Sequence, residues 1–195
     1  MAAKKDKVYG AKLPVGTKRV AIGVDQSYSG FGITFMDMDS DKYYTVVFKG
    51  EGIGVSRLLN IQDKLIELLT LHIPHNAKEV VSAMEGYAFG TQMAHMAGEL
   101  GAIVKVTLWN FLGQYKGKFP YIIPPTVLKK YVTGKGNNVK KNEILLQVYK
   151  KYKIEFNDDN AADSFALAHI ASGKGELAYE REIYHNIQDP KYREQ

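Results

Sequence analysis

The stretch Arg19-Val-Ala-Ile-Gly-Val-Asp25 decides the fold of this chain. It is wholly apolar between its first and last residues, and such short apolar runs bounded by turn residues are typical of buried strands. Two more runs follow, at residues 31–36 and 43–49, and polar turns at residues 26–30 and 37–42 join the three. Runs rich in β-branched and aromatic residues between short turns predict an antiparallel meander.

The hydrophobic period changes after this meander. Leucine and isoleucine recur at helical spacing over residues 55–71, which predicts an amphipathic helix. Residues 79–84 predict a fourth strand that ends at Glu85, residues 90–100 a helix, and residues 102–108 a fifth strand. A helix between two strands, twice over, implies crossover connections and parallel pairing.

The rest of the chain predicts a loop and three helices. Residues 109–124 read as an aromatic, glycine-containing loop, and Pro125 suits the first position of a helix that runs to about residue 132. Asn138 can cap a helix to about Lys151, and residues 158–160 offer caps for a helix over residues 161–171. We therefore expect an α/β fold with a mixed five-stranded sheet and helices on both faces.

The composition is that of one soluble globular domain. Of 195 residues, 45% are hydrophobic, 24% are charged and none is cysteine, which excludes disulfides, thiolate metal sites and a thiol nucleophile. We expect a basic lead-in over residues 1–18, the folded domain over residues 19–172 and a charged tail over residues 173–195. No apolar run approaches the ~18 residues of a membrane span, and the first residues lack a secretory signal, so we expect a cytoplasmic protein with no membrane partner.

Positive charge gathers in one segment. The net charge is +5, yet residues 105–153 hold eleven lysines against a single acid, Glu143. The rest of the chain is therefore net negative. A basic face beside an acidic region suggests a polyanion partner, although a solvated lysine-rich surface explains the same pattern.

Carboxylates stand where predicted strands and helices end. Asp25 and Glu85 each follow an apolar strand, and Asp163 lies in the first turn of an apolar helix, three or four residues after Asn160 and Asp159. Taken singly, each reads as a turn residue, an exposed strand end or a helix cap. Taken together, acidic oxygens converging at one sheet edge repel one another unless a hard cation such as Mg²⁺ neutralises them.

The order of these motifs resembles the RuvC-type Holliday junction resolvases of the RNase H-like nuclease superfamily. The stretch ending at Asp25, with Gly30-Phe-Gly-Ile after it, resembles the opening of that superfamily. Ala-Met-Glu85-Gly-Tyr-Ala-Phe89 looks like the second catalytic strand, and Asn160-Ala-Ala-Asp163-Ser-Phe looks like the terminal catalytic helix. Residues 124–141 are similar to the helix–loop–helix that contacts DNA, so the resemblance covers roughly residues 19–172.

The resemblance implies a role for each matching residue. Asp25 would bridge two Mg²⁺ ions, which Mn²⁺ would replace, while Glu85 and Asp163 would each complete one metal site. Asn160 stands where the family usually has Asp or His, so either Asn160 or Asp159 would be the fourth ligand. The implied DNA contacts are Lys129 and Lys140 near the cut, Lys130, Lys135 and Lys141 beside them, and Tyr87 and Phe89 stacking on bases, although core packing explains the two aromatic residues equally well.

The implied activity is metal-dependent cutting of four-way junctions and other branched DNA by a homodimer, leaving 5′-phosphate and 3′-hydroxyl ends. Three alternatives stay open: another RNase H-like nuclease acting on RNA–DNA hybrids or flaps, an actin-like ATPase domain, and a non-catalytic junction-binding module. The ATPase would need a second glycine-rich phosphate loop and about twice the length. A small, cysteine-free, lysine-rich resolvase would also suit a bacterial virus.

Overall fold

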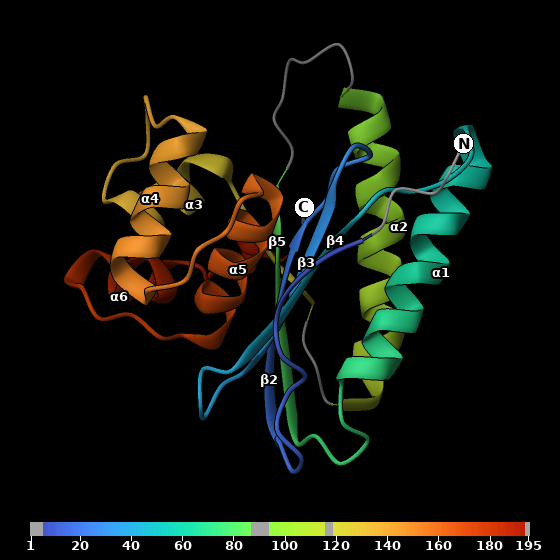
Figure 1. Cartoon of the computed structure of the whole chain (residues 1–195), viewed down its shortest axis with the longest axis horizontal. Helices are drawn as coiled ribbons and strands as arrows, with labels where there is room; N and C mark the ends of the chain where they lie inside the picture. Colours follow the sequence, from blue (N-terminus) through green and yellow to red (C-terminus); the bar gives the residue numbers. More distant parts are fainter. Residues whose placement is uncertain (1–5, 87–93, 116–118, 194–195) are drawn as a thin grey trace.

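The computed structural model describes residues 6–86, 94–115 and 119–193, and a six-stranded sheet runs through its centre (Figure 1). The strand order is β1-β4-β3-β2-β5-β6. The neighbouring pairs β1–β4, β4–β3 and β3–β2 are antiparallel, whereas the pairs β2–β5 and β5–β6 are parallel. The strands are β1 (Lys7–Gly10), β2 (Arg19–Asp25), β3 (Phe31–Asp37), β4 (Tyr43–Phe48), β5 (Glu79–Glu85) and β6 (Tyr121–Ile123).

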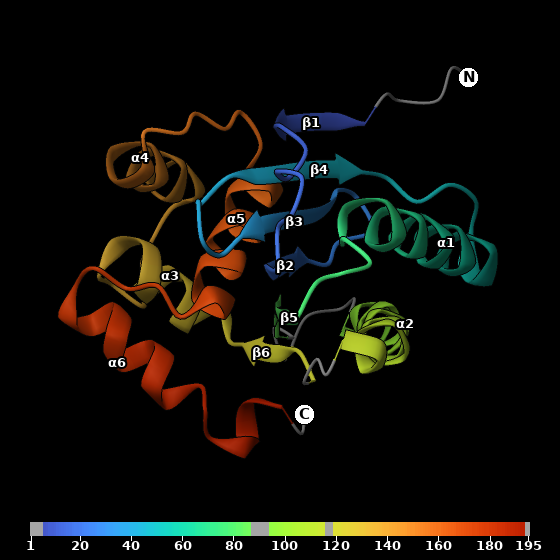
Figure 2. The ribbon, with the colours of Figure 1, turned by 90° about the horizontal axis from the view of Figure 1, so that it is seen from below.

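Helices cover both faces of this sheet, as predicted (Figure 2). One face carries α1 (Gly54–His72) and α2 (Ala94–Leu112), and the other carries α3 (Pro125–Thr133), α4 (Lys141–Tyr152), α5 (Asp159–Ser172) and α6 (Ala178–Asn186). Two short 3₁₀ turns, η1 (Gly113–Tyr115) and η2 (Pro190–Tyr192), complete the described elements. Within the described ranges no helix is both long and apolar enough to cross a membrane.

The alternation of side chains along β2 assigns its residues to two cores. Val20, Ile22 and Val24 belong to the core under α1 and α2, whereas Ala21 belongs to the core under α5. Because successive side chains of a strand point to opposite faces, Asp25 points to the same face as Ala21. The apolar stretch that predicted the strand therefore ends in a carboxylate on the α5 face.

Gly23 sets how closely α5 lies on β2. A Cβ atom at Gly23 would lie 1.9 Å from the carbonyl oxygen of Ser164 and 2.3 Å from the amide nitrogen of Ala168, both in the backbone of α5. Only a residue without a side chain allows this approach. The helix thus crosses β2 in direct backbone contact, two residues before Asp25.

The predicted fifth strand is wrong, because residues 102–108 lie inside α2. Leu100, Val104 and Leu108 are buried at four-residue spacing while Val106 is 54% exposed, which is the burial pattern of a helix. A short apolar run does not by itself distinguish a buried strand from a buried helix. The second parallel neighbour of β5, besides β2, is β6, three residues within the predicted loop 109–124. With β1 and β6 the sheet has six strands, where five were predicted.

Two predictions of local structure also need correction or extension. Lys140, and not Asn138, precedes α4, since Asn138 adopts a left-handed φ of 57° in the connecting loop. Residues 7–10 of the predicted lead-in form β1, which pairs with β4. The division of the chain at residues 18 and 172 stays a prediction.

The charged tail carries α6, which a buried ion pair attaches to α4. Glu180 is fully buried, pairs with Lys151, and accepts hydrogen bonds from the backbone N–H groups of Glu176 and Leu177 at 2.8 and 3.1 Å. Removing one partner of such a pair leaves a buried charge uncompensated, so these contacts hold the tail on the helical layer.

Candidate active site

Strand register brings Asp25 and Glu85 side by side. The two residues end the parallel strands β2 and β5, in which Val24 is aligned with Met84. Ala83 belongs to the core under α5, so Glu85, two residues further on, points to that same face. Both carboxylates therefore lie at one edge of the sheet, on the side that α5 covers.

The first turn of α5 brings further acidic groups to this edge. Asp158 caps the helix by accepting the N–H of Asn160 at 3.0 Å, and the helix begins at Asp159. Its residues 161–171 are buried with the single exception of Asp163. A Cβ atom at Gly32 would lie 2.4 Å from the carbonyl oxygen of Asn160, so the helix start lies directly on β3, opposite Asp25 in the β2–β3 register.

Asp25 is the electrostatic centre of the cluster. Its side chain is buried, and this burial raises the pKa of the carboxyl well above its ordinary value. The negative charges of Glu85 and Asp163, a hydrogen bond with Glu85 and the charge of Asp159 raise the pKa further, in that order. Adjacent carboxylates cannot all ionise without compensation, so the site requires either a shared proton or a cation.

The donor chemistry fits a divalent hard cation. Carboxylate oxygens from β2, β5 and α5 are the ligand type that Mg²⁺ prefers. In the described part of the chain, no three His, Asp or Glu side chains are yet arranged around a common metal position. Asp25 and Glu85 share a hydrogen bond, and both would hold such a cation in their charged, carboxylate form.

Asp159 and Asn160 differ in the groups with which they interact. The charge of Asp159 acts on Asp25. The Asn160 side chain donates to Asp158 at 3.1 Å, and its Nδ2 atom would lie 2.6 Å from a Cβ atom at Gly30. Asn160 is thus oriented by the helix cap, whereas Asp159 belongs electrostatically to the cluster.

The predicted DNA-contacting lysines lie on α3, α4 and the loop between them. Helix α3 begins two residues after Ile123, which is aligned with Glu85, so this helix–loop–helix starts at the carboxylate edge. Lys135 and Lys140 are exposed, Lys129 is half-buried, Lys130 lies 4.0 Å from Glu182, and Lys141 is the first residue of α4. Tyr87 and Phe89 lie outside the described residues.

Several neighbours of the cluster were not anticipated from the sequence. Gln26 donates from Nε2 to the carbonyl oxygen of Glu85 at 3.0 Å and so ties the ends of β2 and β5 together. Lys7 pairs with Asp158 at 2.7 Å, and Lys49 lies at the end of β4 on the same edge. The position of Lys49 was predictable, because an antiparallel meander places residue 49 at the edge that carries Asp25. The position of Lys7 was not, because it depends on β1, a strand that the sequence did not predict.

The mixed sheet, with α5 crossing its centre and carboxylates at one edge, has the α/β architecture of the RNase H-like class. No protein-family model and no curated protein sequence matches the chain. Among solved structures, it is similar to RuvC of Thermus thermophilus, with a TM-score of 0.61 and 19% identity over 87% of this chain and 96% of that one.

Two further structures show the same likeness. T. thermophilus RuvC in complex with a Holliday junction substrate gives a TM-score of 0.60 and 16% identity over 87% of this chain and 96% of that one. The yeast mitochondrial Holliday junction resolvase Ydc2 gives 0.53 and 15% identity over 91% and 85%. At such identities the likeness establishes a RuvC-like fold for this chain.

Proposed function

We propose that this protein is a metal-dependent endonuclease that cuts four-way junctions and related branched DNA. The observation that carries the proposal is the buried Asp25 at the sheet edge, surrounded by the carboxylates of Glu85, Asp163 and Asp159. A buried acid among acids is costly to keep unless it serves a cation, and perturbed groups of this kind concentrate at functional sites.

Each carboxylate has a distinct place in the proposed reaction. Asp25, at the end of β2, would hold both metal ions, Glu85 would complete one site and Asp163 the other. When bound, two Mg²⁺ ions supply an activated water and stabilise the leaving 3′-oxygen, which gives 5′-phosphate and 3′-hydroxyl ends. The chain's own contribution is to fix these oxygens on rigid elements. Because Gly23 has no side chain, α5 packs directly on β2.

The substrate class rests on the positive segment and on the fold. The lysine-bearing helix–loop–helix starts at the carboxylate edge, so phosphates held there would continue into the site. The fold likeness includes a RuvC structure in complex with a Holliday junction substrate. Both favour branched DNA over a small phosphate ester.

A four-way junction requires two symmetric cuts, so we propose a two-fold homodimer with one site in each protomer. Helix α2 exposes Val106 and Trp109 by about half of their surface, which suits an apolar contact between protomers. A bacterial-virus origin stays a prediction that the fold likeness does not test.

The decisive experiment incubates labelled four-way junction with the protein and Mg²⁺, with Asp25→Asn as the inactive control and linear duplex as the control substrate. We expect symmetric nicks in the junction alone, and faster cutting with Mn²⁺ where a ligand has been weakened. Binding without cutting by the wild-type protein would instead favour a junction-binding module.

The fourth ligand is tested by two alanine variants of neighbouring residues. Because the charge of Asp159 acts on Asp25 while the Asn160 side chain donates to Asp158, Asp159→Ala should lower cleavage steeply and Asn160→Ala should cost little. The reverse order, together with a lower Mg²⁺ requirement for Asn160→Asp, would make Asn160 the ligand.

A further inference from the structure

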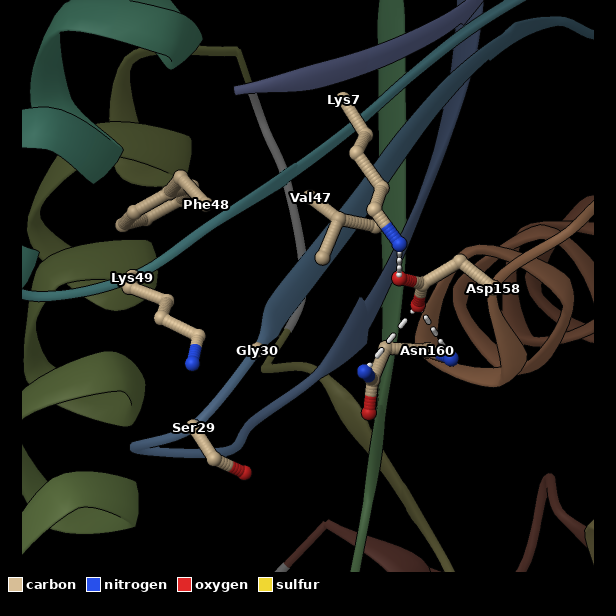
Figure 3. Close-up of a pocket in the computed structure, with 8 residues that line it drawn as sticks. All are labelled: Lys7, Ser29, Gly30, Val47, Phe48, Lys49, Asp158 and Asn160. Atoms are coloured by element: carbon tan, nitrogen blue, oxygen red, sulfur yellow. Dashed lines mark hydrogen bonds and ion pairs between the residues drawn. The ribbon is translucent and has the colours of Figure 1, made fainter. Parts of the chain in front are cut away.

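A pocket of about 210 Å³ lies beside the carboxylate cluster, between the end of β4, the loop before β3 and the first turn of α5 (Figure 3). Lys49 and Ser29 line one side, Asn160 lines the other, and Lys7 lies at the β1 edge. These residues come from four separate segments of the chain. None of them belongs to the lysine-rich helix–loop–helix.

Asn160 lines the pocket and also packs on the start of β3, at the edge of the sheet that carries the cluster. Its side chain lies against Gly30 in the pocket, while its carbonyl oxygen lies over Gly32, the residue aligned with Asp25. A Cβ atom at Gly30 or Gly32 would meet Asn160 at 2.6 or 2.4 Å, so Asn160 packs directly on the start of β3 and the pocket lies next to the sheet edge that carries Asp25.

The pocket is lined by two lysines, Lys7 and Lys49, and by one acid, Asp158, which is paired with Lys7. Lys49 is exposed at the mouth, and Ser29 carries a hydroxyl that hydrogen-bonds to Ser27 at 3.0 Å. Lys7 pairs with Asp158 at 2.7 Å, and Asp158 accepts a hydrogen bond from the side-chain amide of Asn160 at 3.1 Å, so these contacts fix this side of the pocket. The positive end of the α5 dipole faces the same space.

Among the residues that the structure describes, those lining the pocket offer no accessible aromatic face for a base. Of its lining residues, the one aromatic side chain is Phe48, which is 4% exposed and packs on Phe31 with ring centroids 4.9 Å apart. Base recognition on single strands relies on an accessible aromatic face. A lysine, a hydroxyl and an amide instead suit the oxygens of a phosphodiester.

We propose that this pocket binds a backbone phosphate of the cut DNA strand, next to the phosphate that is hydrolysed, with Lys49 as its principal cation. The inference rests on the proposed function, because it places the strand across the carboxylate edge. It adds a contact on the β1–β4 side of the sheet, made by residues outside the helix–loop–helix. A strand held at two separate places is fixed along its direction as well as at one point.

The test measures junction binding by wild-type protein in EDTA, where no cutting occurs, over 50 to 200 mM salt. Lys49→Ala is compared with Lys42→Ala, because Lys42 is an exposed lysine at the opposite end of β4. Loss of one phosphate contact reduces the salt slope by about 0.9, which changes the affinity ratio to wild type about three- to fourfold over this range. We expect that change for Lys49→Ala and none for Lys42→Ala, with Lys49→Arg restoring the wild-type slope.

A second arm identifies the phosphate. Junctions carrying one neutral methylphosphonate at each position beside the cut should weaken wild-type binding at one position, and that same position should be silent for Lys49→Ala. Equal salt slopes for Lys49→Ala and Lys42→Ala, or no position that couples to Lys49, would overturn the pocket while leaving the proposed function intact. Failure of the wild-type protein to bind the junction would refute the proposed function, and this inference with it.

Discussion

Replacing Gly23 by alanine tests the backbone contact between β2 and α5, which brings Asp163 close to Asp25. The new methyl group would lie 1.9 Å from the Ser164 carbonyl oxygen and 2.3 Å from the Ala168 nitrogen. Ordinary contact begins at 3.4 Å, so α5 must move away from β2 by about 1.5 Å. Both colliding atoms belong to the helix backbone, so no side chain can rotate to relieve the clash.

The displacement has two measurable consequences. Overpacking of a well-packed core costs about 1–3 kcal/mol, and the backbone collision places Gly23→Ala at the upper end of that range. The same movement draws Asp163 away from Asp25. A misplacement of about 1 Å in a catalytic group costs on the order of 100-fold in rate, so junction cleavage should fall by about that factor even in the folded variant.

Urea unfolding of wild type, Gly23→Ala and Gly98→Ala gives the stability readout. Gly98 lies within α2, and outside its own helix backbone no atom of the described residues lies within 4 Å of the added methyl group, so its alanine variant should gain about 0.5–1 kcal/mol from helix propensity. If Gly23→Ala unfolds within about 0.5 kcal/mol of wild type and cuts normally, α5 does not lie on β2 in backbone contact and the reasoning fails.

The position of Asp25 and Glu85 at one edge of the sheet was predictable, because it depends only on where two strands end and on how side chains alternate along them. Asp25 and Glu85 each end an apolar strand, and parallel strands end at a common edge. The period of two then fixes which face both side chains share. Neither step needs a contact that is distant in sequence beyond the pairing of β2 with β5.

Other parts of the molecule depend on contacts that local patterns do not encode. Residues 102–108 contain enough β-branched side chains to resemble a strand. Only the burial of Leu100, Val104 and Leu108 on one face shows that they form a helix. Strand β6 has three residues, too few for a periodic signal. The pocket beside the cluster needs Lys7 from β1 and Asp158 from the α5 cap, which are 151 residues apart.

Three further predictions concern the cluster, the basic segment and the core. Asp25→Asn should abolish junction cleavage and leave binding unchanged or tighter, because one repulsive charge is lost; more than a few per cent residual cutting in Mg²⁺ would contradict its bridging role. Lys129→Ala and Lys140→Ala should each reduce the salt slope of junction binding by about 0.9, and an unchanged slope would make them solvated surface residues. His169 should contribute to the loss of stability in acid: its ring is buried against Tyr152, and burial first, then Lys151 and Lys174, lower the pKa of His169 to about 3 from about 6.5. Asp41 and Glu176, which line the same cavity, and Glu180, which pairs with Lys151, do not reverse this direction. Since the folded state disfavours the charged ring, the stability that His169 contributes is complete above about pH 6.5 and is lost as the pH falls toward 3. Between pH 6 and 4 the wild-type protein should therefore lose about 1.4 kcal/mol per pH unit more than His169→Gln, measured by urea unfolding at each pH. Parallel stability curves for the two proteins would show that His169 is charged within the fold, and the packing assigned to it would be wrong.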